Sequence, residues 1–271
     1  MNIWKNTPTL DEFVPELSDA CDAAEGEVAV IGGKKIDLDS LPKLRGIFKC
    51  GIGRDNVPEA ECAKRGIAVC FPSESTSRII FEETANFAVY LIFRMLYSEI
   101  GDLRAWKKHS RPFLGTKNVL LIGQGNIGRQ VAEKLRPSVG VSTFDVVSND
   151  PSELQGLVAA ADVVSLHIPL MAETTGFIDA EKLSWMKDGA ALVNTARGPI
   201  VDEAALLDEI RDARLRAAFD VYWQEPYTGP LREFHPEYFL MSPHVASTCR
   251  DFLQGLADDL RRFIGELKSQ E

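Results

Sequence analysis

Three residues in the second half of the chain have side chains suited to moving a proton and holding a carboxylate. His244 can exchange a proton near neutral pH, because the ordinary pKa of imidazole lies there. Glu225 can accept a hydrogen bond from the other ring nitrogen, which would fix the tautomer and raise the imidazole pKa. Arg197 offers a planar guanidinium that binds a carboxylate and polarises an adjacent carbonyl. These residue types predict hydride exchange with an alcohol that carries a carboxylate.

Each of the three residues also has a plainer interpretation. His244 can be structural, Glu225 an ordinary loop carboxylate and Arg197 a surface cation. The other histidines are weaker candidates, because they lie beside lysines, at a strand edge or in a proline-flanked loop: His109, His167 and His235.

A hydride needs a carrier, and one glycine-rich stretch predicts a dinucleotide site. The apolar run Val119–Ile122 leads into the pattern G-x-G-x-x-G, which is followed by a helical pattern. Gly123 would permit the tight turn, Gly125 would let the backbone approach a pyrophosphate, and Gly128 would let the helix pack against the strand. Such a turn alone is weak evidence, because glycines also merely reverse the chain. Its position between a strand and a helix favours a dinucleotide-binding turn over a simple reversal of the chain.

An acidic residue about twenty positions further on indicates which dinucleotide. Asp145 ends a second strand pattern, Val141–Asp145, where a carboxylate accepts hydrogen bonds from the adenosine ribose. At ~4 Å and an effective dielectric of ~20, like charges repel by about 4 kcal/mol, which would reject the 2′-phosphate of NADP. We therefore expect NAD. Asp220 can accept from the nicotinamide carboxamide, with a capping or structural role as its alternative.

The elements that position these residues alternate between strands and helices. Further strand patterns follow the glycine turn at 162–168, 190–196, 215–221 and 238–241. Six strands separated by helices predict a doubly wound parallel sheet, which binds ligands beyond the carboxyl ends of its strands. The residues at those ends are expected to share one crevice: Gly123, Asp145, Pro169, Arg197, Asp220 and His244. Helix caps are expected at Ser152, in a Ser152–Gln155 capping box, and at Asp202.

The first third of the chain predicts a smaller α/β domain. Strand patterns lie at 28–31, 44–49 and 67–71, with helices at 10–20 and 58–65. The segment 79–97 is apolar on nearly every side and predicts a buried helix, and 101–112 is interpreted as a connection. Three cations near strand ends can hold an anionic substrate, or can be solvated surface groups: Lys34, Lys35 and Arg54.

Composition limits the partners. The net charge is −10 over 271 residues, so no global basic field attracts nucleic acid or an anionic membrane. The five cysteines form no C-x-x-C pair, which favours buried thiols in a reducing cytoplasm over disulfides or a metal site. No signal-like or membrane-spanning segment is present. We expect a cytoplasmic protein with no metal, nucleic-acid or membrane partner.

Taken in order, six motifs resemble one family. They are Gly51-Ile-Gly-Arg-Asp-Asn56, Gly123–Gly128, Leu166-His-Ile-Pro-Leu170, Asn194-Thr-Ala-Arg-Gly198, Asp220-Val-Tyr-Trp-Gln-Glu-Pro226 and Pro243-His-Val-Ala246. Together they are highly specific. The chain resembles the D-isomer-specific 2-hydroxyacid dehydrogenases, which include D-3-phosphoglycerate dehydrogenase and glyoxylate/hydroxypyruvate reductases.

The resemblance implies an NAD-dependent oxidoreductase acting on a 2-hydroxy or 2-keto acid, with Arg197, Glu225 and His244 as its catalytic residues. Gly51, Ile52 and Gly53 match the loop that binds the substrate carboxylate. The implied cofactor contacts are Gly123, Gly125, Asn126, Ile127, Gly128, Asp145, His167, Pro169, Thr174, Thr195, Ala196, Asp220 and Ala246.

The resemblance also implies two domains and a homodimer. A Rossmann-type NAD-binding domain would span 79–247, and a smaller flavodoxin-like α/β substrate domain would combine 1–78 with 248–271. The last helix would thus return to the first domain. The family usually dimerises through the cofactor domain.

The chain departs from the family pattern in three places. The N-terminal part is shorter, and the connection before Val119 lacks most of the usual dimer-arm insert. Arg54 replaces a residue that is usually apolar or small. We hypothesise that Arg54, with Lys34 or Lys35, binds a second anionic group such as phosphate or carboxylate.

Two relatives within the resemblance suggest other functions. Formate dehydrogenases share the Arg and His but carry Gln where Glu225 stands, so Glu225 argues against that activity. NAD-bound corepressors keep most of the site residues. A non-catalytic NAD(H)-binding sensor or corepressor-like protein therefore stays open as the alternative function.

Overall fold

The computed structural model describes residues 1–98 and 100–269, and it divides into two compact units. One unit combines Met1–Phe81 with Ser247–Glu271, and the other is Glu82–Ala246. The expected boundaries, 1–78 with 248–271 and 79–247, differ from these by one to three residues. Residues 270 and 271, which the expected boundary includes, lie outside the described residues. The two units are described separately.

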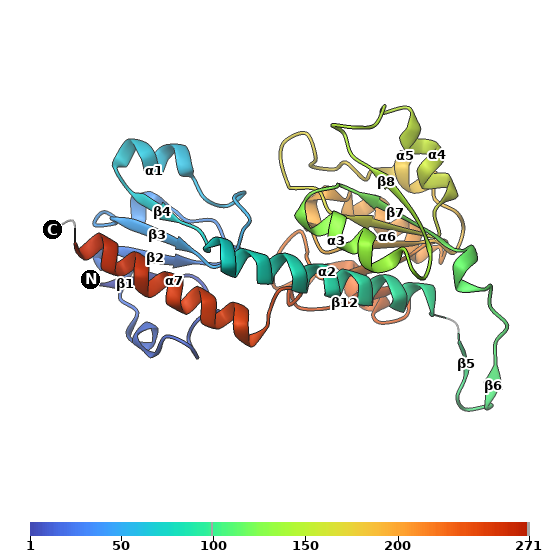
Figure 1. The fold of residues 1–271 in the computed structure, drawn as a ribbon, viewed down its shortest axis with the longest axis horizontal. Helices are drawn as coiled ribbons and strands as arrows, with labels where there is room; N and C mark the ends of the chain where they lie inside the picture. The colour runs from blue at the N-terminus through green and yellow to red at the C-terminus, as the bar shows by residue number, and fades with distance from the viewer. Residues whose placement is uncertain (99, 270–271) are drawn as a thin grey trace. The chain divides into compact units, whose positions relative to one another are not determined.

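The first unit is built on a four-stranded parallel sheet in the order β1-β2-β3-β4 (Figure 1). The central strands are buried and, apart from Lys49 at the end of β3, carry no polar side chain, as expected for a parallel sheet covered on both faces. The elements are β1 (Ile3–Lys5), β2 (Val28–Ile31), β3 (Gly46–Lys49), β4 (Ala68–Cys70), α1 (Glu59–Arg65) and α7 (Arg250–Lys268). Three short 3₁₀ helices complete it: η1 (Pro15–Asp19), η2 (Ala23–Glu25) and η3 (Leu38–Ser40).

Helix α7 covers one face of this sheet. Its apolar residues recur every three or four positions and are buried with strand residues Val28, Val30 and Phe48. Gly46 of β3 makes the close approach possible, because a Cβ there would lie 2.7 Å from Leu267 and Phe263. The last helix thus belongs to the unit formed by the start of the chain.

The first unit contains one strand that was not expected, and one expected helix was wrong. The strand Ile3–Lys5 was not predicted, because three residues are too few to show a period. The helix expected at 10–20 is a series of turns followed by the 3₁₀ helix Pro15–Asp19. Pro15 has no N–H to donate to a preceding carbonyl, so an α-helix cannot continue through it.

The second unit contains a six-stranded parallel sheet in the order β12-β11-β10-β9-β7-β8. The order reverses between β7 and β9, which makes the doubly wound arrangement that the sequence predicts. The fold class is therefore confirmed. The strands are β7 (Asn118–Ile122), β8 (Gly140–Phe144), β9 (Val163–Leu166), β10 (Ala191–Asn194), β11 (Arg216–Phe219) and β12 (Phe239–Met241).

Helices cover both faces of the six-stranded sheet (Figure 1). One core lies under α2 and α3, and the other lies under α4, α5 and α6. The helices are α2 (Glu74–Leu96), α3 (Asn126–Leu135), α4 (Glu153–Ala160), α5 (Ala180–Ser184) and α6 (Glu203–Arg211), with the 3₁₀ helices η4 (Leu114–Thr116), η5 (Gly198–Ile200) and η6 (Pro230–Phe234). Among the described helices, none is long and apolar enough to span a membrane.

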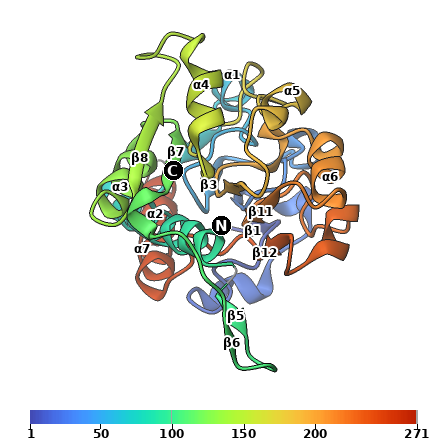
Figure 2. The same cartoon turned by 90° about the vertical axis from the view of Figure 1, so that its right-hand side faces the viewer.

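Three further expectations differ from the structure. Helix α2 is buried on one face only, since Asn86, Tyr90 and Arg94 lie on an exposed side. The connection 101–112 contains an antiparallel hairpin, β5 (Gly101–Asp102) with β6 (Lys107–Lys108), which extends from its unit in Figures 1 and 2. Alternating polarity is weak there, so the hairpin has no clear sequence signal.

The third difference is the capping box at Ser152, which does not form. The Ser152 side chain caps nothing and instead donates to Asp150, at 2.7 Å. Asp150 Oδ1 accepts from Ser152 N, and Glu153 Oε1 accepts from Asp150 N, so these two carboxylates bind the backbone before the helix. Helix α4 begins at Glu153 as expected, but Ser152 before it has a helical backbone, φ −65° and ψ −18°, instead of the extended one typical of a capping residue. The Asp202 cap is confirmed, with 3.0 Å to Ala205 N.

Candidate active site

The glycine-rich turn joins β7 to α3 as the sequence predicts. Gly123 has φ +104°, and a Cβ there would lie 2.5 Å from the His167 carbonyl oxygen. A Cβ on Gly128 would lie 2.0 Å from the Gly123 carbonyl oxygen, so only glycine permits this packing. Around Gly125, in contrast, no described atom lies within 4 Å of the Cβ position. The turn therefore leaves open space beside the start of a ten-residue helix, which fits a dinucleotide pyrophosphate.

Two alanine substitutions are expected to separate folding from cofactor binding in this turn. Gly128→Ala should destabilise the protein by at least about 1–3 kcal/mol, because its Cβ meets backbone that cannot move away. Gly125→Ala should leave the melting temperature nearly unchanged but weaken NADH binding, because its Cβ enters the open space. Thermal denaturation and NADH fluorescence titration measure both. Equal melting temperatures for the two variants would contradict this account.

Asp145 lies immediately after β8 and faces the glycine turn. Its Oδ2 accepts a hydrogen bond from Gln124 N at 2.8 Å, and its Oδ1 accepts from Val147 N at 3.0 Å. Each carboxylate oxygen retains a lone pair for a further donor. The geometry thus puts a negative charge next to the turn, where an adenosine ribose is expected.

His167 follows β9 and is held neutral. Desolvation by burial lowers its pKa from 6.5 to about 4, and its Nε2 lies 3.0 Å from Ser165 Oγ. The next loop is held by Thr174, whose hydroxyl donates to the Pro169 carbonyl at 2.6 Å and accepts from Met171 N at 2.8 Å. In the structure Thr174 therefore organises the loop that carries Pro169.

The depressed pKa of His167 predicts a loss of stability in acid. Above pH 6.5 the imidazole is neutral in both folded and unfolded chains. As the pH falls from 6.5 towards 4, only the unfolded chain binds the proton, so the free energy of unfolding should fall by up to about 3 kcal/mol. Urea unfolding at a series of pH values measures this. His167→Gln should flatten the curve in that window, and an unchanged slope would exclude His167 as its cause.

Arg197 stands on a turn that Asn194 organises from β10. The buried Asn194 side chain donates to the Arg197 carbonyl at 2.8 Å and accepts from Ala196 N at 2.9 Å. The Arg197 Nη1 donates to the Ala196 carbonyl at 2.7 Å. In the described part of the chain, Thr195 Oγ1 is buried and makes no hydrogen bond. An orphaned hydroxyl beside this turn fits a site that is completed by a ligand.

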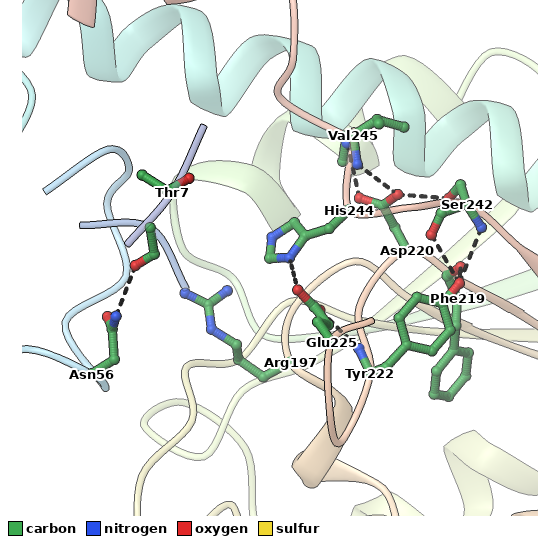
Figure 3. A network of polar contacts seen from close by, with 12 residues as sticks. Thr7, Asn56, Arg197, Phe219, Asp220, Tyr222, Glu225, Ser242, His244 and Val245 are labelled. Atoms are coloured by element: carbon green, nitrogen blue, oxygen red, sulfur yellow. Dashed lines mark hydrogen bonds and ion pairs between the residues drawn. The ribbon is translucent and has the colours of Figure 1, made fainter. Parts of the chain in front are cut away.

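His244 and Glu225 form the hydrogen-bonded pair that the residue types suggest. His244 Nδ1 lies 2.8 Å from Glu225 Oε2 (Figure 3). Desolvation raises the pKa of Glu225, but the hydrogen bond and charge of His244, with a contribution from Arg197, outweigh it and hold that pKa below its usual value. The Arg197 guanidinium is thus close enough to act on this carboxylate. The structure brings all three candidate catalytic residues together.

The hydrogen bonds of Asp220 match the structural alternative, and its nicotinamide contact stays a prediction. Its carboxylate accepts hydrogen bonds from Ser242 Oγ at 2.6 Å, Val245 N at 2.9 Å and Ala246 N at 2.8 Å (Figure 3). Burial raises its pKa, and these hydrogen bonds with the charge of His244 offset only part of the rise. The geometry therefore gives Asp220 the structural alternative, in which it fixes the loop around His244. One acceptor position remains for a ligand.

The substrate candidates of the first unit lie on two loops. Gly51 has φ +148°, and Lys34 and Lys35 are exposed. Arg54 is engaged locally: its Nη1 lies 2.7 Å from Glu59 Oε2, and its guanidinium lies 4.0 Å from the centre of the Phe71 ring. Ile52 and Gly53 lie between Gly51 and Arg54 in the same loop.

Sequence analysis missed Lys49, a buried cation directly before that loop. Only 4% of Lys49 is exposed, and its Nζ donates to the Gly32 carbonyl at 2.5 Å. Asn56 donates to the same carbonyl at 2.8 Å and to the Lys34 carbonyl at 2.7 Å, so it joins the two loops. A lysine that ends an apolar strand just before a glycine turn was the available signal.

Known proteins share both the sequence and the fold. The family model described as D-isomer specific 2-hydroxyacid dehydrogenase, NAD binding domain, matches residues 99–246. A glyoxylate reductase of Thermofilum pendens is 32% identical, over 87% of this chain and 76% of its own length. A D-3-phosphoglycerate dehydrogenase of Mycobacterium tuberculosis is 33% identical over 90% of this chain, which spans about half (48%) of that protein.

A solved structure shows the same fold over the whole chain. The D-lactate dehydrogenase of Aquifex aeolicus, complexed with NAD and lactic acid, superposes with a TM-score of 0.81 at 22% identity. The superposition covers 100% of this chain and 96% of the other. Among the described residues, no group of three or more His, Cys, Asp or Glu side chains is placed to bind a metal.

Proposed function

Since the chain belongs to the D-isomer specific 2-hydroxyacid dehydrogenases, we propose that it catalyses NAD-dependent hydride transfer between a 2-hydroxy acid and its 2-keto acid through Arg197, Glu225 and His244. The observation that carries this proposal is the 2.8 Å His244–Glu225 pair, with the Arg197 charge beside it, in the unit that contains the NAD-binding domain. The reaction needs a general acid–base group and a cation that binds the substrate carboxylate, both next to the nicotinamide cofactor.

Each of the three residues has one task. Arg197 binds the substrate carboxylate and polarises the adjacent carbonyl. His244 donates a proton to the carbonyl oxygen during reduction and removes it from the hydroxyl during oxidation. Glu225 accepts from His244 Nδ1, which fixes the tautomer and leaves Nε2 for the substrate. NAD, when bound, supplies or accepts the hydride at nicotinamide C4.

NAD is held by the second unit in this proposal. The glycine turn with Asn126 and Ile127 receives the pyrophosphate, and Asp145 receives the ribose. The orphaned Thr195 hydroxyl would gain a hydrogen-bond partner from the bound cofactor. The loop residues expected to line the rest of the site are His167, Pro169, Thr174, Ala196, Asp220 and Ala246. In the first unit, Gly51, Ile52 and Gly53 are the residues proposed to contact the substrate carboxylate.

The first experiment measures NADH oxidation by the purified protein with a panel of 2-keto acids. The panel includes glyoxylate, hydroxypyruvate, 2-oxoglutarate and phosphorylated or phosphonate analogues, with NADPH as the cofactor control. Saturable turnover with NADH is expected and would identify the substrate. Tight NADH binding without turnover on any acid would contradict the proposal and favour a sensor or corepressor-like protein.

A second anionic group on the substrate is a narrower proposal. Arg54, with Lys34 or Lys35, would bind it, since the Arg54 side chain is 61% exposed and keeps donors beyond its contact with Glu59. A phosphate or second carboxylate suits this charge. Arg54→Ala should raise KM for a substrate with two anionic groups and leave KM for glyoxylate unchanged. The same KM for every active substrate would refute the proposal.

A homodimer is proposed on the basis of the β5–β6 hairpin. Four large apolar side chains in and beside the hairpin are exposed: Ile100 (62%), Leu103 (80%), Trp106 (82%) and Phe113 (77%). Such a cluster on one short segment favours burial against a second copy. Trp106→Asp should shift the protein towards monomer in analytical ultracentrifugation, while Met171→Asp, at another exposed apolar residue, should not. No shift in either variant would contradict the proposal.

A cytoplasmic location is proposed from the thiols. All five cysteines are free in the structure, which suits a reducing compartment. Cell fractionation tests this, and recovery of the activity outside the cytosolic fraction would contradict it.

A further inference from the structure

The loop after β11 contains a tyrosine that no catalytic step uses. Tyr222 lies two residues after Asp220, and only 7% of it is exposed. Its ring stacks on Tyr227 with centroids 5.0 Å apart and meets the edge of Phe239 at 6.4 Å. Packing alone would be satisfied by phenylalanine, so the buried hydroxyl requires an explanation.

The Tyr222 hydroxyl joins the ends of two neighbouring strands. It lies 2.8 Å from the Phe219 carbonyl at the end of β11 and 2.8 Å from the Ser242 carbonyl just after β12. It also accepts from Ser242 N at 3.1 Å. One proton shared between two carbonyls, with one N–H received, satisfies the hydroxyl completely. The hydroxyl thus fixes where the chain leaves the sheet before His244.

Both partners of the His244–Glu225 pair depend on Tyr222. The Ser242 carbonyl that receives the Tyr222 hydroxyl also accepts from His244 N at 3.1 Å. At the other side, Tyr222 N donates to Glu225 Oε1 at 3.1 Å, while Glu225 Oε2 binds the imidazole (Figure 3). These hydrogen bonds form a closed ring, which passes from the Tyr222 hydroxyl through Ser242, His244 and Glu225 to the Tyr222 backbone N–H.

His244 needs such support because its backbone is strained. Its φ is +55°, in the left-handed region that residues with a side chain seldom adopt. A residue stays there only when its surroundings hold it. Asp220 fixes the backbone after His244, through Val245 N and Ala246 N, and the Ser242 carbonyl fixes the backbone before it.

We propose that Tyr222 is a positioning residue for catalysis, whose hydroxyl sets the turn that aims His244 at Glu225 and the substrate. The proposal rests on the proposed function of that pair. The hydroxyl acts through the Ser242 carbonyl, and its hydrogen-bonding capacity is already filled by Phe219 and Ser242.

The matched test compares Tyr222→Phe with Tyr227→Phe. Both variants lose one buried hydroxyl from the same aromatic stack, but the Tyr227 hydroxyl binds Glu203 at 2.7 Å and Leu231 N at 3.2 Å, not the His244 turn. Tyr222→Phe should lower kcat roughly five- to tenfold, as expected for the loss of one such hydrogen bond. Tyr227→Phe should keep kcat even if its melting temperature falls as far. NADH affinity should be unchanged in both.

The pH profile separates positioning from general stability. His244 lowers the pKa of Glu225, so a looser pair should let that pKa rise towards its usual value. The acid limb of kcat/KM for reduction of the 2-keto acid should therefore move to higher pH in Tyr222→Phe and stay in place in Tyr227→Phe. If Tyr222→Phe keeps both the wild-type kcat and the wild-type acid limb, the proposal is overturned.

A measurement without turnover distinguishes this proposal from the proposed function. Carboxyl ¹³C NMR follows the titration of Glu225 whether or not a substrate is known. A rise in the Glu225 pKa in Tyr222→Phe alone supports the positioning role even if the wild-type protein turns over no acid. Identical Glu225 titration in the wild type and Tyr222→Phe refutes the positioning role even if the wild type is active.

Discussion

His244→Asn should lower kcat by about 10²- to 10⁴-fold, because it removes the group that exchanges the substrate proton. Asparagine retains polarity and tolerates the left-handed backbone at φ +55°, so the turn should keep its shape. NADH affinity should change little, since the glycine turn and Asp145 are untouched. Steady-state kinetics and NADH fluorescence titration measure the two effects separately.

His235→Asn is the matched control for this prediction. His235 lies in the same unit, is exposed and accepts a hydrogen bond from Met241 N at 3.1 Å, away from Glu225. We expect it to retain kcat. Wild-type activity in His244→Asn, or an equal loss in both variants, would remove His244 from the mechanism.

Asp145→Asn should change cofactor preference, and its effect is the second largest. The carboxylate would face the 2′-phosphate of NADPH, and like charges at ~4 Å repel by about 4 kcal/mol at an effective dielectric of ~20. Removing that charge should raise kcat/KM for NADPH by roughly 10²- to 10³-fold. The asparagine carbonyl can still accept from Gln124 N, which now donates to Asp145 at 2.8 Å, so the turn should be preserved.

Asp150→Asn also removes one negative charge from the loop between β8 and α4, and it serves as the control. Asp150 accepts from Ser152 N and lies at the start of α4, so it should have no effect on the choice of cofactor. Kinetics with NADH and NADPH compare the variants. An unchanged ratio of the two cofactors in Asp145→Asn would show that Asp145 does not select NAD.

The parallel sheets were the most predictable part of the fold. Strands buried on both faces have to be apolar along their length, so β2, β7, β9 and β10 are visible as short runs of Val, Ile, Leu and Ala. The order of a doubly wound sheet then collects the strand ends at one edge. For that reason Arg197 and His244 were expected to share one crevice, whereas Glu225 was expected beside His244 from its residue type alone.

Local hydrogen bonding was less predictable, because neighbouring residues of similar chemistry compete for the same role. Asp150 and Ser152 are both good caps by residue type, and the helical backbone of Ser152 excludes it from that role. Asp220 illustrates the same limit at the site. Its type suits a nicotinamide contact, but the turn at 242–246 brings two backbone N–H groups to its carboxylate.

The Tyr222 network was beyond sequence analysis for a related reason. Its contacts depend on two carbonyl groups, from Phe219 and Ser242, and every residue type has a carbonyl. Lys49 left a clearer trace, since a cation at the end of an apolar strand is unusual unless it has partners inside the protein.

The most direct test of the central claim is isotope transfer. The protein is incubated with NADH deuterated at the transferring C4 position and the best 2-keto acid of the panel, and the hydroxy acid product is examined by mass spectrometry and chiral chromatography. This account predicts a D-2-hydroxy acid with deuterium at C2, formed about 10²- to 10⁴-fold more slowly when His244→Asn replaces the wild type. A product without deuterium, or no hydroxy acid from any member of the panel, would contradict it.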